Sequence, residues 1–261
     1  MTLERVRLIS IRLAIVGVVL GAWELVGRFW VDPFWTSMPS RVAGRLFDWS
    51  QDGTLGPAIQ TTATEILLGL AVGISAGGLI AIALGQSKML STVVRPYVIV
   101  MYAIPQLALA PLYILWFGLF LTPKVVLVAV MSAFFTFFNV YEGVRSTEDR
   151  IVAEMQLLGA SRLQVLRWVV LPSAAVFIIA SLRQTIPNGI QAAIVGEFIV
   201  SVQGLGYLAH QASVVLDLTG IFAAVVVVAA IGLILDQLVS LGERMWLRGR
   251  ADLVRTAALP A

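Results

Sequence analysis

The sequence contains no cysteine and a single histidine, His210. The lack of cysteine excludes disulfide bonds, thiolate catalysis and cysteine-based metal sites, and one histidine without companions predicts no metal site. Charged residues are also scarce, at 13% of the chain, against about 25% in an average soluble domain. The composition therefore supports neither a soluble fold nor a nucleic-acid-binding surface.

Apolar residues are what the sequence has in excess, at 59% of 261 residues. They fall into about six segments of roughly 20 residues, the length that a helix needs to cross a hydrocarbon core about 30 Å thick. The predicted spans are 11–31, 62–84, 96–119, 124–143, 172–200 and 219–243. We expect an all-α, polytopic helical bundle surrounded by membrane lipid, with one transmembrane domain, 11–250, between the N-terminus, 1–10, and a tail, 251–261.

Basic residues predict the orientation of the bundle. Lys and Arg in short loops of membrane proteins lie mainly on the cytoplasmic side. If the N-terminus is inside, Arg28, Arg41, Arg45 and Lys124 fall outside and Arg183 lies within a span, which leaves 13 of the 18 basic residues inside. This bias predicts that both termini are cytoplasmic.

The second predicted span carries glycines at four-residue spacing, Gly69, Gly73 and Gly77. This spacing places three positions without side chains on one stripe of the helix, where another helix can approach closely. We interpret the stripe as a packing face.

The third predicted span contains Pro105 and Pro111. Each removes a backbone hydrogen bond within the membrane, which predicts a bent or broken helix. Such a helix either lines a translocation path or is simply kinked. The predicted path residues are Tyr102, Pro105, Gln106, Pro111, Asn188, Gln191 and Glu197.

The predicted cytoplasmic segment 145–172 has the pattern of two short helices joined by a turn. Apolar residues such as Met155 and Leu158 recur at helical spacing, Gly159 tolerates positive φ, and Ser161 is suited to capping a second helix. The segment is either a protein-contacting element or an amphipathic helix that rests on lipid headgroups.

This segment resembles the cytoplasmic signature of the permeases of binding-protein-dependent ABC importers. In that signature a Glu-Ala-Ala triplet precedes a glycine by three residues, and nine residues separate the glycine from Ile-x-Leu-Pro. Here Gly159 is followed after nine residues by the run from Val169 to Pro172, whereas the triplet positions hold Ala153, Glu154 and Met155. The glycine half of the signature matches, and the glutamate is displaced by one position.

Further stretches resemble one branch of that family, the sulfonate, taurine and nitrate permeases and their relatives for thiamine or riboflavin precursors. These stretches are Pro39-Ser40, Pro105 to Leu112, Trp116 to Gly118, Leu182-Arg183 and Gly204 to Tyr207. The likeness covers roughly residues 20 to 245. It leaves two substrate classes open, a small organic anion and a heteroaromatic vitamin precursor.

The resemblance implies a homodimeric permease in the inner membrane that works by alternating access with a cytoplasmic ATPase dimer and a periplasmic or extracellular binding protein. It implies that 145–172 inserts into the ATPase. The ATPase-contacting residues would be Ala153, Glu154, Met155, Leu158, Gly159, Ala160, Ser161 and Arg162. Loops 32–57 and 201–220 would face the binding protein.

No cofactor is expected on this chain. Its lysines, Lys88 and Lys124, follow Ser87 and Pro123, so the sequence has no Gly-Lys-Ser/Thr phosphate loop. We therefore expect ATP and Mg²⁺ on the partner ATPase and no catalytic residue on this chain.

Ionisable residues within spans are costly and are therefore suspected of function. We expect Arg183 to pair with an acidic neighbour such as Asp236 rather than to contact an anionic substrate, and we place Glu65 and Glu197 near the outer ends of their spans. The lone His210 is expected on the outer surface.

Two other classes of protein remain as alternatives. An ion-coupled secondary transporter would have inverted repeats with acidic groups near the membrane midplane, and an integral-membrane enzyme would have clustered carboxylates or histidines. The sequence shows neither pattern clearly.

Overall fold

The computed structural model describes residues 3–32, 34–145 and 149–248. The first residues of the predicted N-terminus, positions 146–148 of the segment 145–172, and the predicted tail 251–261 lie outside the described residues. Helices joined by short turns make up the described residues, which contain no strand, and this confirms the predicted all-α class.

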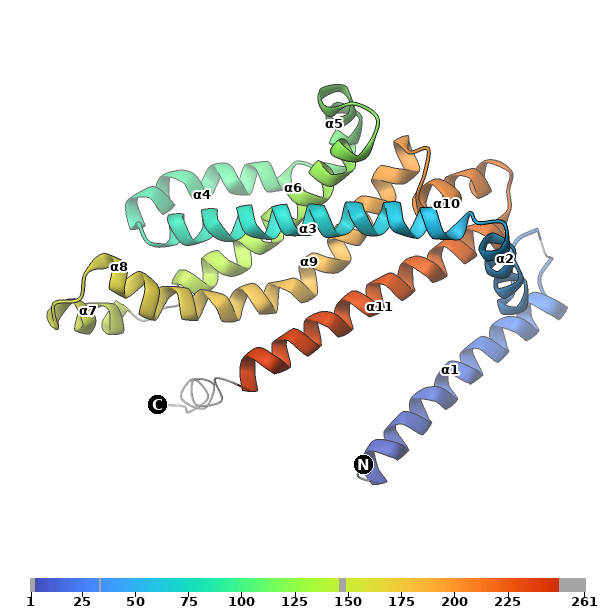
Figure 1. The fold of residues 1–261 in the computed structure, drawn as a ribbon, viewed down its shortest axis with the longest axis horizontal. Helices are drawn as coiled ribbons and strands as arrows, with labels where there is room; N and C mark the ends of the chain where they lie inside the picture. The colour runs from blue at the N-terminus through green and yellow to red at the C-terminus, as the bar shows by residue number, and fades with distance from the viewer. Residues whose placement is uncertain (1–2, 33, 146–148, 249–261) are drawn as a thin grey trace.

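Thirteen helical elements follow one another along the described part of the chain (Figure 1). They are α1 Leu3–Phe29, α2 Pro39–Gln51, α3 Leu55–Gly85, α4 Lys88–Ala103, the 3-10 turn η1 Gln106–Leu109, α5 Ala110–Phe117, α6 Leu121–Arg145, α7 Asp149–Leu157, α8 Arg162–Val165, the π turn η2 Leu166–Val170, α9 Leu171–Val200, α10 Leu205–Val214 and α11 Leu218–Arg248.

Five helical segments are long and apolar enough to span a membrane, and α4 with η1 and α5 forms a sixth candidate that is bent by 74°. This agrees with the prediction of about six spans. The third span begins earlier than predicted, at Lys88, because the Ser87 hydroxyl caps α4 by accepting a hydrogen bond from Leu90 N at 3.2 Å.

Helices α3, α6 and α9 form the centre of the bundle, with α6 packed between the other two. Their shared core contains Ile66, Leu127, Val128 and Ile190. The glycine stripe of α3 faces α6 as predicted. A Cβ atom at Gly69, Gly73 or Gly77 would collide with Val128, the Ala129 carbonyl or the Ala133 backbone, respectively.

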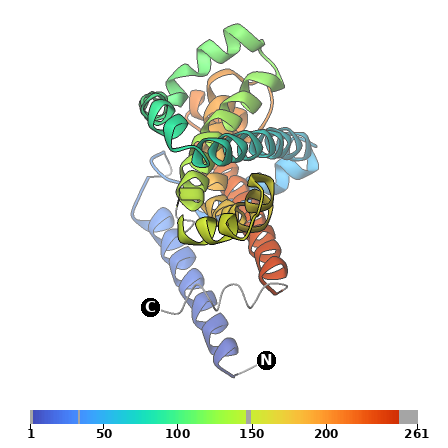
Figure 2. The ribbon, with the colours of Figure 1, turned by 90° about the vertical axis from the view of Figure 1, so that its left-hand side faces the viewer.

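The short helices lie at opposite ends of the bundle: α7 and α8 at one end, and α2 and α10 at the other (Figures 1 and 2). We call these the elbow end and the α10 end. Helix α1 diverges from the bundle, and its contacts cluster near the α10 end, where the Glu24 carboxylate accepts hydrogen bonds from Ser40 N at 3.0 Å and Ser40 Oγ at 2.8 Å. Apolar side chains nearer the N-terminus of α1, such as Leu13 and Val18, are exposed and need lipid or another chain to cover them.

Candidate functional site

The predicted glycine turn after α7 is present and has a defined geometry. Gly159 has φ +85°, its N–H donates to Gln156 O at 3.0 Å, and Ala160 N donates to Met155 O at 2.9 Å. These two bonds form the Schellman arrangement, in which a residue of positive φ ends a helix and satisfies its last carbonyls. A side chain at Gly159 would meet no atom, so backbone conformation alone selects glycine here.

The predicted cap of the second helix is also confirmed. Ser161 Oγ accepts from Gln164 N at 3.3 Å, and Gln164 Oε1 accepts from Ser161 N at 2.7 Å, which is a reciprocal capping box. Helix α8 then continues through the π turn η2 directly into α9. We call residues 149–170 the elbow.

The elbow has a packed side and an open side. Val165 and Val170 are buried in a cluster with Val144, and Met155 and Ala160 are partly buried against it. On the open side Leu157, Leu158 and Leu163 are 88%, 86% and 71% exposed. Of the predicted contact residues, Ala153, Glu154, Leu158, Gly159, Ser161 and Arg162 are exposed, whereas Met155 and Ala160 hold the elbow to the bundle.

Leu157 and Leu163 are not among the predicted contact residues. The sequence offered one signal for them: each is next to a predicted contact residue on a predicted helix. A side chain on a short helix at the surface points either to the bundle or away from it, and only the packed structure separates the two directions.

The side chain of Gln106 forms hydrogen bonds across the break in the third span. After α4 ends at Ala103, the Gln106 side-chain amide donates to Met101 O at 2.9 Å and to Ile104 O at 3.2 Å, and Gln106 Oε1 accepts from Tyr113 Oη at 3.0 Å. The amide thus supplies a donor to Ile104 O at the break and a second donor to Met101 O, which also accepts from Ile104 N at 3.3 Å.

The predicted path residues are not equivalent in the structure. Pro105 precedes η1 at the break, and Pro111 lies in the first turn of α5, where a missing N–H costs little. The break adjoins α9, which carries Asn188 and Gln191. Tyr102 instead packs against an aromatic group on α6.

Gln106→Leu is expected to destabilise the chain by about 1–3 kcal/mol, because Ile104 O and the Tyr113 hydroxyl lose their partner and Met101 O keeps only its bond from Ile104 N. Tyr113→Phe removes one of the three bonds and is expected to cost about 0.5–1.5 kcal/mol. Thermal unfolding in detergent measures both. Equal losses for the two variants would contradict the role assigned to the Gln106 amide.

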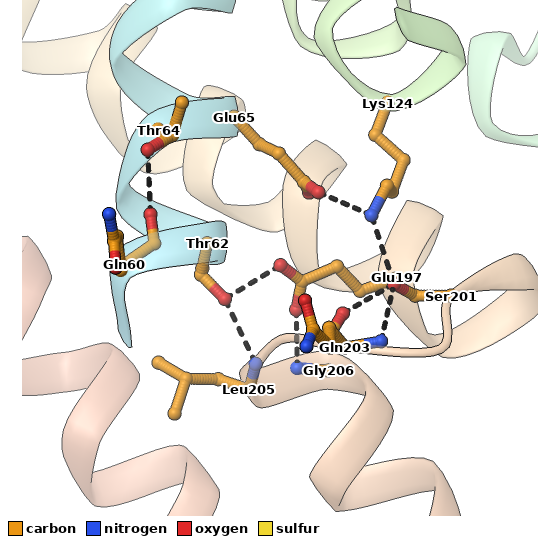
Figure 3. Close-up of polar contacts among 10 residues, drawn as sticks. All are labelled: Gln60, Thr62, Thr64, Glu65, Lys124, Glu197, Ser201, Gln203, Leu205 and Gly206. Atoms are coloured by element: carbon orange, nitrogen blue, oxygen red, sulfur yellow. Dashed lines mark hydrogen bonds and ion pairs between the residues drawn. The ribbon is translucent and has the colours of Figure 1, made fainter. Parts of the chain in front are cut away.

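A buried polar network lies near the α10 end (Figure 3). Thr62, Glu65 and Glu197 are 0% exposed and Lys124 is 7% exposed. Lys124 forms an ion pair with Glu65 and donates to Ser201 Oγ at 2.9 Å. Lys124 is the cation that faces Glu65, and the Glu197 carboxyl group also lies close to the Glu65 carboxylate.

Glu197 has a different environment from the one predicted. Its carboxylate accepts from Thr62 Oγ1 at 2.6 Å and from Gly206 N at 2.6 Å, and Thr62 Oγ1 in turn accepts from Leu205 N at 2.9 Å. The side chain is enclosed between α3, α9 and the start of α10. It therefore does not line an open path in the single chain, because its oxygens are engaged by protein donors.

Arg183 pairs with an acidic residue of α11, as predicted, but its partner is Glu243 and not Asp236. Arg183 Nη2 lies 2.6 Å from Glu243 Oε2, with the arginine side chain 57% exposed. Glu243 is two helical turns beyond Asp236 on α11, toward the elbow end. Neither side chain of this pair is fully buried, so both charges keep part of their hydration.

Helices α2 and α10 border a hollow of about 680 Å³ at the α10 end, lined in part by Arg45, Tyr207, His210 and Asp217. Arg45 and Asp217 form an ion pair across it. His210 packs edge-on against Phe198 with 5.0 Å between ring centroids. Among the described residues, no three His, Asp or Glu side chains are grouped to hold a metal ion.

Residues 69–246 match the family described as binding-protein-dependent transport system inner membrane component. A probable ABC transporter permease protein of Haemophilus influenzae is 33% identical over 85% of this chain and 91% of its own length. The riboflavin transport system permease of Chloroflexus aurantiacus is 32% identical over 82% of this chain and 80% of its own length. The taurine transport system permease of Escherichia coli is 28% identical over 88% of this chain and 86% of its own length.

Two solved structures share the fold. The inward-facing methionine ABC transporter MetNI aligns with TM-score 0.60 and 18% identity over 73% of this chain and 97% of the matched chain. An amino acid ABC transporter crystallised with histidines aligns with TM-score 0.60 and 20% identity, over 76% and 96%. At these identities the likeness concerns the fold alone.

Proposed function

Since the chain belongs to the inner-membrane components of binding-protein-dependent transport systems, we propose that it carries a small organic nutrient inward as one half of a permease dimer, with the elbow as its contact to the ATPase. The chain is the transmembrane, non-enzymatic subunit of an ABC importer. ATP and Mg²⁺ then bind to the partner subunit, and the work of hydrolysis enters this chain through the elbow.

The observation that carries this proposal is the open side of the elbow. Three leucines, Leu157, Leu158 and Leu163, project from a short unit whose turn and cap are both closed by hydrogen bonds. Exposed apolar side chains on a rigid support suit insertion into a groove of another protein. A helix that merely rested on headgroups would not need the glycine turn and the capping box.

This role places the elbow end in the cytoplasm. The start of α1 and the end of α11 then lie toward the cytoplasmic side, in agreement with the distribution of basic residues. The α10 end faces outward, and the hollow between α2 and α10 offers polar groups, Arg45, His210 and Asp217, to an external binding protein.

A second copy of the chain and lipid would cover the remaining apolar surface. The divergent helix α1 and the exposed face of α11, with Leu233 66% and Ile234 60% exposed, are suited to both. In a dimer the translocation path runs between the two copies, where the broken span adjoins α9. The proposed path residues are Pro105, Gln106, Pro111, Asn188 and Gln191.

The names of the relatives suggest the classes of substrate to test. One relative is a taurine permease, one a riboflavin permease and one a formylaminopyrimidine permease. The apolar character of the spans favours neither the organic anion nor the heteroaromatic class.

Reconstitution tests the proposal. The purified chain is placed in liposomes with its ATPase and binding protein, and uptake of labelled taurine, riboflavin and formylaminopyrimidine is followed. We expect uptake of one class that requires ATP, the ATPase and the binding protein together. Uptake driven by an ion gradient in liposomes that lack the ATPase would contradict the proposal and favour a secondary transporter.

A further inference from the structure

The N-terminus of α10 is held by side chains from other helices and not by a residue of its own. The first N–H groups of a helix have no intrahelical acceptor. In α10 the Leu205 N–H donates to Thr62 Oγ1 at 2.9 Å, and the Gly206 N–H donates to the Glu197 carboxylate at 2.6 Å (Figure 3). The residue that precedes the helix, Gly204, has no side chain to offer.

Gly204 and Gly206 leave the space that this contact between α10 and α9 needs. Gly204 has φ +115°, and a Cβ there would overlap the Glu197 carboxyl group. A Cβ at Gly206 would lie 2.5 Å from Ile194 O and 2.7 Å from Glu197 Cβ. The Gly-x-Gly sequence thus allows the start of α10 to close directly onto α9, with the Glu197 carboxyl group at the positive end of the helix dipole.

The turn before α10 is tied to a third helix. Lys124, on α6, donates to Ser201 Oγ at 2.9 Å and forms its ion pair with Glu65 on α3. Helices α3, α6 and α9 thus all hold the same few residues, through side chains that are 93% or more buried. Breaking a buried charged contact is costly because the remaining charge loses its partner.

Helix α9 connects this anchor to the elbow. It runs from Leu171 to Val200, a length of roughly 45 Å at 1.5 Å per residue. The anchored α10 joins one end of it and the elbow continues from the other through η2. Pro187 removes one backbone hydrogen bond inside α9, but the helix is continuous from Leu171 to Val200, and a continuous helix that is held at both ends transmits a displacement between them.

We propose that Thr62 and Glu197 are positioning residues that fix α10 rigidly onto α3 and α9, so that binding-protein contact at α10 is transmitted along α9 to the elbow. This inference rests on the proposed function, in which α10 faces the binding protein. The buried network would then have a mechanical role, since none of its residues belongs to the proposed path or to the ATPase contact.

The anchor itself is tested by hydrogen exchange of the amides in residues 201–214. Thr62→Val keeps the shape of the side chain and removes the hydroxyl. We expect exchange at Leu205 and Gly206 to become at least about tenfold faster, because one buried hydrogen bond is lost outright and the other is weakened. Thr62→Ser, which keeps the hydroxyl, should retain slow exchange.

Thr64→Val is the matched control. Thr64 lies on the same helix, and its hydroxyl donates only to Gln60 O, at 2.7 Å, within that helix. The same chemical change two residues away should leave exchange in α10 unchanged.

Transmission is measured in the reconstituted complex as the ratio of ATP hydrolysis with binding protein to hydrolysis without it. The binding protein is used with the ligand that it retains on purification. We expect Thr62→Val and Glu197→Gln to lose the stimulation while basal hydrolysis and copurification of the ATPase persist. Thr62→Ser and Thr64→Val should keep it.

Each result decides the inference. Unchanged exchange in Thr62→Val would overturn the anchor, and faster exchange with full stimulation would overturn its role in transmission. If wild-type hydrolysis does not respond to the binding protein at all, the proposed function fails and the transmission role with it, while the exchange data report separately on the anchor.

Discussion

Gly159→Val is expected to abolish ATP-driven uptake while the chain still inserts into the membrane. Gly159 has φ +85°, a conformation that a β-branched residue adopts only with strain of about 1–3 kcal/mol. No atom lies near the position that a Cβ would occupy, so the effect arises from the backbone and not from a clash. The strain is relieved by opening the turn, because the elbow is a peripheral unit with few other constraints. Its leucines then lose their fixed arrangement.

Copurification of the tagged ATPase with the chain, and uptake in liposomes, measure this loss. Gly159→Asn is the matched control, since asparagine tolerates positive φ far better than valine and should retain most of the association. Full association of the ATPase with the Val variant would remove the elbow from the interface. A loss of membrane insertion in the Val variant would show that the turn serves folding instead.

The second large effect is expected from Gly77→Ala in the glycine stripe of α3. A methyl group there would overlap the Ala133 backbone, so α3 and α6 must move apart along their whole contact. Overpacking of a well-packed contact costs about 1–3 kcal/mol. Because α3–α6 is the most extensive helix contact of the bundle, we expect a lower Tm and less folded protein in the membrane.

The adjacent glycine provides the control. A Cβ at Gly78 would lie 3.9 Å from Thr136 Cγ2, an ordinary van der Waals distance. Gly78→Ala should therefore leave the Tm unchanged or raise it slightly, since alanine favours a helix over glycine. Thermal unfolding in the same detergent compares the two. Equal shifts for Gly77→Ala and Gly78→Ala would mean that the close approach of α6 is not what the stripe provides.

The membrane spans were predictable because their signal is local. A run of about 20 apolar residues must be helical in lipid, where each backbone polar group needs an internal partner. The same holds for the elbow, since a glycine at positive φ and a serine cap act within a few residues of themselves. The turn and the cap of the elbow could therefore be predicted from the residues around Gly159 and Ser161.

The partners of the charged residues were less predictable. Arg183 has two acidic candidates on α11, Asp236 and Glu243, and the sequence alone does not indicate which carboxylate the side chain reaches. The helices α2 and α10 were expected only as loops that fold against the bundle. Their hydrophobic patterns are short, and α10 depends on caps from residues far away in the chain, Thr62 and Glu197.

By itself, the sequence determined that this protein is an α-helical membrane bundle, where its third span breaks, and that a glycine turn precedes the fifth, and its basic residues predict an orientation. These properties depend on hydropathy, charge and backbone preference over short stretches. Only the tertiary structure decided that Glu65, Lys124 and Glu197 share one buried network and that α10 is anchored by it. Contacts between residues so far apart in sequence arise from the packing of α3, α6 and α9, which no local pattern specifies.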